Sequence, residues 1–165
     1  MKKIFTLAFI MLLASCDNNN TDALQGIWET KLCEVAPSSL GPHEGKYGKG
    51  IYEFTENNTI KSTIQFYSGA SCDEKTETLE TSGNDQLLIF IDSGATTLEE
   101  GISGHGFSIT YPVPDQPSSF DGFYTLINGE LCFSDIINFN VYSVRSSGAE
   151  TVSIDFEKCL IQIQP

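Results

Sequence analysis

Apolar and polar residues alternate along most of the chain after residue 25. The clearest runs, residues 28–32, 60–66 and 152–156, carry an apolar side chain at every second position. A period of two with Thr, Ile, Val and Phe in excess is typical of half-buried β-strands. No window of a dozen residues shows the spacing of an amphipathic helix, so the pattern predicts an all-β protein. Further strands are predicted at residues 51–55, 75–81, 87–92, 106–111, 122–127, 130–133, 138–144 and 160–164.

Short turns between these strands suggest their connectivity. Asn128-Gly129 separates two apolar runs, and both residues tolerate the positive φ of a tight hairpin. Residues 56–58 and 82–85 are predicted to form short turns between two other pairs of consecutive strands. Consecutive strands joined by short turns form a meander, and a meander closed on itself leaves no exposed edge. We therefore predict an antiparallel up-and-down β-barrel of about 8 to 10 strands.

Three segments interrupt this regularity and are predicted to be irregular surface loops. Residues 36–49 would connect the first two strands, residues 94–106 are rich in Gly, Ser and Thr, and residues 111–119 contain three prolines. Surface loops often carry binding residues, and they also tolerate insertions of no functional importance. The sequence leaves both interpretations open.

The first sixteen residues have the composition of an export signal. Lys2 and Lys3 precede an apolar run at residues 4–13, which is too short to span a bilayer as a helix. Residues 13–16, Leu-Ala-Ser-Cys, resemble the lipobox of bacterial lipoproteins, in which the signal is removed before a cysteine that carries lipid. The resemblance implies a signal peptide at 1–15, lipidation of Cys16, a polar flexible tether at 16–23 and a folded domain at 24–165. The alternative is an ordinary signal peptide in which Cys16 is incidental.

The lipobox resemblance also implies a location. A lipidated Cys16 would anchor the protein in the bacterial cell envelope, facing the periplasm. Asp17 directly after that cysteine is similar to the inner-membrane retention signal of enteric bacteria, a rule that many other lineages do not follow. The choice between inner and outer membrane therefore stays open.

Four cysteines remain in the domain, Cys33, Cys72, Cys132 and Cys159. An exported protein with an even number of cysteines is expected to form disulfides, and three connectivities are available. Loop closure favours the sequential pairs, Cys33 with Cys72 and Cys132 with Cys159. A zinc site is the alternative, but no two cysteines have a C-x₂₋₄-C spacing and neither histidine is close to a pair.

The charge of the chain limits its partners. The formal charge is −13, and it becomes −15 when Lys2 and Lys3 leave with the signal peptide. Such a surface repels nucleic acid and anionic headgroups, so only the lipid on Cys16 would hold the protein on a membrane. The acidic residues are scattered, which fits simple solubility, although a basic protein partner is a second interpretation.

The opening Leu24-Gln25-Gly26-Ile27-Trp28-Glu29 contains a Gly-x-Trp motif on the first predicted strand, and residues 52–55 and 128–133 fit the same pattern. On these residues, the chain from 24 to 164 resembles the lipocalins and the lipocalin-like lipoproteins of bacteria. The resemblance implies a barrel that binds a small apolar molecule, with Arg145 packed over Trp28 to close one end. A cation over an indole is worth about 0.5–2 kcal/mol, and plain core packing is the alternative role of Trp28. The inward residues expected to line a ligand are Phe54, Ile60, Ile64, Phe66, Phe90, Phe107, Tyr124 and Leu126.

Catalytic and metal motifs are weak throughout the chain. Ser103-Gly104-His105 lacks the Gly that a nucleophile elbow requires, and no metalloprotease, phosphate-loop or calcium-loop pattern occurs. We therefore expect no enzyme activity, no cofactor and no metal. The main hypothesis is a lipid-anchored protein that binds a small apolar ligand. The alternatives are an envelope protein-interaction module that uses residues 36–49 and 94–119 against a basic partner, and, last, an enzyme.

Overall fold

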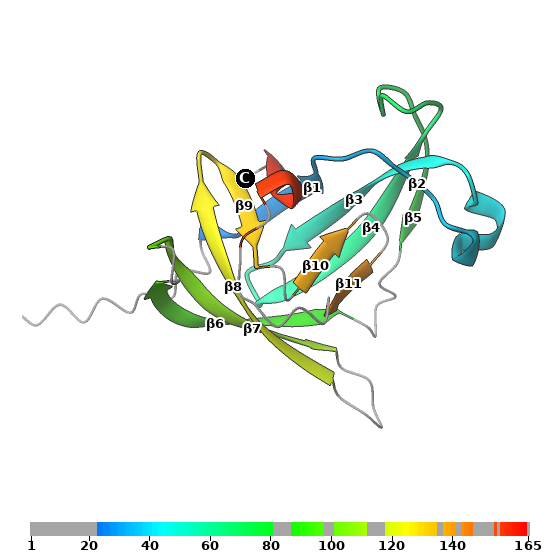
Figure 1. Ribbon diagram of the computed structural model, residues 1–165. Coiled ribbons are helices and arrows are strands. Elements are labelled where there is room, and N and C mark those ends of the chain that lie inside the picture. Colours follow the sequence, from blue (N-terminus) through cyan, green and yellow to red (C-terminus); the bar gives the residue numbers. More distant parts are fainter. Residues whose placement is uncertain are drawn as a thin grey trace, which may run out of the picture.

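The computed structural model describes residues 23–80, 87–97, 101–111, 118–134, 137–140, 143–146, 154 and 156–164 (Figure 1). The predicted signal peptide, Cys16 and residues 17–22 of the tether lie outside this part. The described chain is almost entirely β-structure, with two short 3₁₀ helices, η2 (Ser38–His43) and η3 (Phe156–Lys158). In the residues described, no helix has the length and apolarity to cross a membrane. The strands are β1 (Gly26–Thr30), β2 (Glu34–Val35), β3 (Tyr47–Phe54), β4 (Thr59–Tyr67), β5 (Lys75–Glu80), β6 (Leu88–Thr97), β7 (Ser103–Tyr111), β8 (Ser118–Ile127), β9 (Glu130–Phe133), β10 (Ile137–Asn140), β11 (Ser143–Ser146) and β12 (Leu160–Gln164).

Eight of these strands form a closed antiparallel barrel. They are β1, β3, β4, β6, β7, β8, β9 and β12, each paired with the next, and β12 pairs with β1 to complete the circle. Strands β2 and β5 extend the sheet beside β3 and β4, while β10 and β11 form a separate two-stranded sheet. The prediction of an up-and-down barrel is confirmed.

The tight turns follow from residues that accept a positive φ. Asn128 and Gly129 have φ values of 55° and 81°, and they join β8 to β9 with Ile127 opposite Glu130. Asn58, with φ of 56°, turns the chain between β3 and β4. The hairpins predicted at Asn128-Gly129 and at residues 56–58 are confirmed, because short polar side chains tolerate the left-handed region that these turns require. The turn predicted at residues 82–85 lies outside the described residues, and the strands on either side of it do not form a hairpin, since β5 and β6 both pair with β4.

The prediction of an irregular loop at 94–106 is wrong. Strand β6 continues to Thr97 and β7 begins at Ser103, with Gly94 paired to Gly106 and Thr97 to Ser103. A register shift between Asp92 and Gly94 marks a bulge, and Gly94 has a φ of 96°. The Gly-, Ser- and Thr-rich composition therefore reflects a bulged hairpin with a partly exposed surface rather than an absence of strand.

Two further strand predictions need correction near the C-terminus. Residues 138–144 do not form one strand, because β10 and β11 form a hairpin in which Asn140 pairs with Ser143. The expected strand at 152–156 is also wrong where it is described, since Ile154 makes only an isolated bridge with Ser134 and Phe156 begins η3. Alternation of apolar residues did not distinguish these short pieces from strands of the barrel.

The side chains that point inward form one main core. Its buried members come from all eight barrel strands and from Leu24, just before β1. A second cluster joins Ala36 to Ile64 and Phe66, beyond the barrel proper and beside β5. The main core consists of Leu24, Trp28, Tyr52, Phe54, Ile60, Leu88, Phe90, Phe107, Ile109, Tyr124, Leu131, Phe133 and Leu160.

Both favoured disulfides are confirmed. Cys33 and Cys72 are bridged with a Cα–Cα distance of 6.0 Å, and Cys132 and Cys159 with 4.2 Å. The second bridge is buried with Phe123 in a third cluster, on the outer face of the barrel. Restriction of the unfolded chain by each bridge is worth about 2–4 kcal/mol.

Candidate functional site

Aromatic side chains fill the middle of the barrel. Phe90 lies at the centre, with ring centroids 5.6 Å from Phe54, 5.3 Å from Phe107 and 5.8 Å from Tyr124. Phe107 in turn makes an edge contact with Phe133 at 5.4 Å. Such contacts add to the burial of the rings, so they stabilise the core and occupy space that a ligand would need.

The eight residues expected to line a ligand do not share one environment. Phe54, Ile60, Phe90, Phe107 and Tyr124 belong to the main core. Ile64 and Phe66 lie instead in the second cluster, under the segment that contains η2. Leu126 is 41% exposed and lies near the end of β8.

A pocket of about 460 Å³ opens at the end of the barrel where β6, β7 and β8 project. On β7, Ser103 and His105 are two residues apart and therefore share one face of the sheet. His105 pairs with Tyr124 of β8, so all three side chains lie on the inner face. The described residues that line the pocket include no carboxylate. They are Ala23, Ala95, Thr96, Thr97, Ser103, Gly104, His105, Tyr124, Thr125 and Leu126.

The inner wall of this pocket is fixed by a buried carboxylate, Asp92, whose side chain is 6% exposed. Tyr124 donates its hydroxyl hydrogen to Asp92 at 2.8 Å, and the Gly94 N–H donates at 2.6 Å. The His105 Nδ1 lies 3.1–3.2 Å from the two carboxylate oxygens. Three donors on one buried carboxylate satisfy it, so it holds the pocket residues in place at little cost in desolvation.

Ring stacking and burial complete this arrangement. The rings of His105 and Tyr124 stack at 5.3 Å, and Tyr124 is 2% exposed. Burial raises the pKa of the Tyr124 phenol, and its hydrogen bond to Asp92 raises that pKa further. Tyr124 is therefore a neutral donor over the ordinary pH range.

Sequence reasoning singled out His105 and Ser103 but missed Asp92. The predicted strand at 87–92 ends at Asp92, whereas in the structure Asp92 continues the inward alternation of Leu88 and Phe90 within a longer β6. The sequence signal for this site is an acidic residue at an inward position of an apolar strand. Such a residue indicates a polar cluster inside the barrel, because a buried carboxylate needs hydrogen-bond donors. Ser103 and His105 lie within strand β7, which differs from the strand-to-helix turn of a nucleophile elbow.

The other histidine lies at the opposite end of the barrel. His43, in η2, stacks on Phe66 with centroids 4.7 Å apart. Its Nδ1 is 3.4 Å from Glu77 Oε2, an ion-pair distance without hydrogen-bond geometry. A hydrogen bond from Lys46, at 2.7 Å, lowers the pKa of Glu77. The structure thus does not bring His43 and His105 together.

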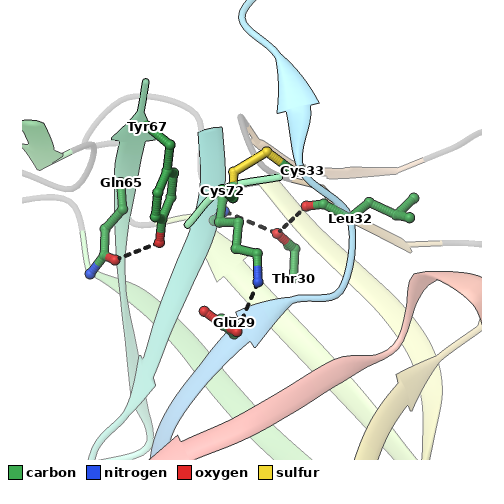
Figure 2. A network of polar contacts seen from close by, with 9 residues as sticks. Glu29, Thr30, Leu32, Cys33, Gln65, Tyr67 and Cys72 are labelled. Atoms are coloured by element: carbon green, nitrogen blue, oxygen red, sulfur yellow. Dashed lines mark hydrogen bonds and ion pairs between the residues drawn. A yellow bond between two sulfur atoms is a disulfide. The ribbon is translucent and has the colours of Figure 1, made fainter. Parts of the chain in front are cut away.

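A second polar network, shown in Figure 2, secures the chain that leaves β1. Lys49 donates to Glu29 at 2.9 Å, on the outer face of the barrel. Thr30 accepts from the Gly50 N–H and donates to the Leu32 carbonyl, beside the Cys33–Cys72 bridge. This network connects β1, β3 and the following loop, so its role is structural.

The predicted closure of the barrel by Trp28 and Arg145 is described only in part. Trp28 is 1% exposed, and its Nε1 donates to the Leu24 carbonyl at 2.8 Å. Arg145 lies in β11 opposite Asn138, and its side chain is outside the described part. The contact between the two therefore stays a prediction.

The cysteines are not available as metal ligands in this structure. Glu130, Cys132 and Cys159 place their ligand atoms within 4.8 Å of one another, but the two sulfurs are bonded to each other. Zinc binds thiolates, which a disulfide does not supply.

Comparison with known proteins does not assign the chain to a family. No family model matches the chain, and neither a curated protein nor a solved structure matches it.

Proposed function

We propose that this protein is a non-catalytic, lipid-anchored member of the bacterial envelope that binds a small apolar molecule at the end of its barrel. The pocket of about 460 Å³ carries this proposal. Its size falls within the range of about 300–1,000 Å³ typical of small-molecule sites. Two other hollows, of about 530 and 580 Å³, are lined by charged residues such as Glu53 and Lys61, so the lining and not the volume favours this pocket for an apolar ligand. The closed eight-stranded barrel and the Gly26-Ile27-Trp28 opening support kinship with the lipocalin-like lipoproteins.

The chemistry of the lining supports an apolar ligand with few polar groups. Ala95 and Leu126 offer carbon surface, and hydroxyls of threonine and serine surround them. The carboxylate of Asp92, behind the wall, accepts from three donors. Ser103 and His105 lie within strand β7 and not on the strand-to-helix turn of a nucleophile elbow, which favours binding over catalysis.

Ligand binding is tested with an apolar naphthylamine probe whose fluorescence rises in an apolar site. Leu126→Glu should weaken probe binding by at least about tenfold, or 1.4 kcal/mol, because it places a carboxylate in the pocket. Ile91→Glu is the matched control, since Ile91 is also exposed on a strand, at 54%, but lies outside the pocket. Equal affinity for all three chains would refute the pocket as the site.

The anchor has its own test. Mass spectrometry of the membrane fraction should find a mature chain that begins at Cys16 and carries acyl groups. Cys16→Ser should move the protein to the soluble fraction. A mature N-terminus elsewhere, or identical partitioning of both chains, would contradict lipidation.

A protein-interaction role is the second candidate function. The observation that favours it is the segment 36–46, which is held against the sheet by backbone bonds between Ala36 and both Gly45 and Lys46. This segment exposes Pro37, Ser38 and Ser39, and the formal charge of −13 over the whole chain would suit a basic partner. If a Leu126→Glu chain still complements a deletion strain fully, the interaction role gains support over ligand binding.

A further inference from the structure

The pocket and the start of the tether lie at the same end of the barrel. Ala23, the first residue described, is one of the residues that line the pocket. Leu24 beside it is 1% exposed, and its carbonyl accepts the hydrogen bond from Trp28 Nε1. Gln162 also donates to the Gln25 carbonyl at 3.2 Å. The chain is therefore fastened to the barrel at the rim of the pocket, and it cannot swing to another face without breaking these contacts.

The opposite end is occupied by different elements. η2 precedes β3, whose first residue, Tyr47, pairs with Tyr67 at the end of β4. The end of β6, the start of β7 and the β8–β9 turn lie at the left of Figure 1, whereas β2, β5 and the coil of η2 lie at the right. A ten-residue strand such as β6 is about 30 Å long, which gives the scale of this separation.

Chain length sets how far the pocket can lie from the anchor. Seven residue steps separate Cys16 from Ala23. A fully extended chain of that length spans at most about 25 Å, and a flexible one has a root-mean-square span of about 15 Å. If Cys16 carries lipid, the rim of the pocket stays within this distance of the headgroups in every orientation of the domain. The η2 end is under no such constraint.

We propose that the pocket is loaded from the membrane side, so that its ligand is a molecule that partitions into the bilayer and enters the barrel at the tethered end. This inference rests on the proposed function. The ligand chemistry is the same as for a molecule taken from the aqueous periplasm, namely a small apolar compound. What differs is the source of the ligand. A short tether gives the pocket a high effective concentration at the membrane that holds the anchor, which favours loading from that membrane.

The test compares loading from vesicles with binding in solution. The full-length lipidated protein is reconstituted in vesicles that contain the naphthylamine probe, and loading is followed by energy transfer from Trp28, the one tryptophan of the sequence. The anchored chain should load at least about tenfold faster than Cys16→Ser at the same low vesicle concentration. An insertion of about 40 Gly/Ser residues between Asn20 and Thr21 should slow loading by about tenfold, since effective concentration falls with about the −3/2 power of tether length.

The decisive control is a chain that carries its lipid at the η2 end of the barrel instead of at Cys16. Ser38→Cys in the Cys16→Ser background can be coupled to a thiol-reactive lipid, because Ser38 is exposed in η2 and the other cysteines are bridged. This chain should bind the probe in solution with normal affinity but load slowly from vesicles. Equally fast loading by the two anchored chains, or by Cys16→Ser, would overturn the inference while leaving the proposed function intact. Failure of every chain to bind the probe in solution would overturn both.

Discussion

Replacing Trp28 with alanine is expected to lower the free energy of unfolding by about 3–5 kcal/mol, the usual cost of deleting a large aromatic from a core. Trp28 is the largest of the fully buried side chains, at 1% exposure, and it packs with Leu24 at the tethered end of the barrel. The loss should appear in denaturant unfolding followed by circular dichroism, because the variant has no tryptophan to report by fluorescence.

Trp28→Phe separates the volume of the indole from its hydrogen bond. Phenylalanine retains much of the apolar bulk but leaves the Leu24 carbonyl without its donor. We expect a loss of about 1–3 kcal/mol, the cost of leaving one buried polar group unsatisfied. Equal losses in the two variants would show that the hydrogen bond, not the packing, dominates. A loss below about 1 kcal/mol for Trp28→Ala would mean that the core collapses around the gap.

The position of Trp28 also ties stability to the pocket. Its hydrogen bond fixes Leu24, and Leu24 precedes the first barrel strand directly after Ala23 at the pocket rim. A variant that loosens this contact should therefore change the pocket as well as the core. Probe binding by Trp28→Phe reports this coupling under conditions where the protein remains folded.

Much of the barrel could be predicted from the sequence because each strand repeats one simple physical requirement. Strands with one face in the core place apolar residues at every second position, and this is visible at Ile60, Phe107 and Ile109. The hairpin at Asn128-Gly129 was equally accessible, since its residues are suited to a positive φ. The disulfides followed from an even count and sequential pairing, and the structure has both.

The candidate site was harder to predict because it depends on pairings between distant strands. Asp92 and Tyr124 are 32 residues apart and meet only through the barrel. The pocket wall is built by the hairpin β6–β7, whose Gly- and Ser-rich sequence has the composition of a loop. The bulge at Asp92 and Gly94 shifts the register locally, and a periodicity of two carries no signal for such a shift. Filling of the interior by Phe90 and its neighbours likewise depends on how the strands are staggered.

Gly104 illustrates how close that packing is, and its replacement by alanine should destabilise the protein by about 3 kcal/mol. A Cβ at Gly104 would collide with the Tyr124 carbonyl oxygen and lie 2.6 Å from the Phe123 ring. The carbonyl belongs to β8, which is paired with β7 from Ser118 to Tyr124, so it cannot move aside as a flexible side chain would. The variant should therefore separate the two strands locally and disturb the His105 and Tyr124 wall of the pocket.

Gly69→Ala is the matched control for Gly104→Ala. Gly69 has open space around the position of a Cβ and no left-handed φ, so its replacement should change the free energy of unfolding by no more than about 0.5 kcal/mol. Denaturant unfolding of both variants measures the difference, and probe binding should weaken only in Gly104→Ala. Equal stability of the two variants would show that β7 and β8 have more room than this structure gives them. In that case, the wall formed by His105 and Tyr124 would not be fixed by strand packing, and the pocket would adapt its shape to the ligand.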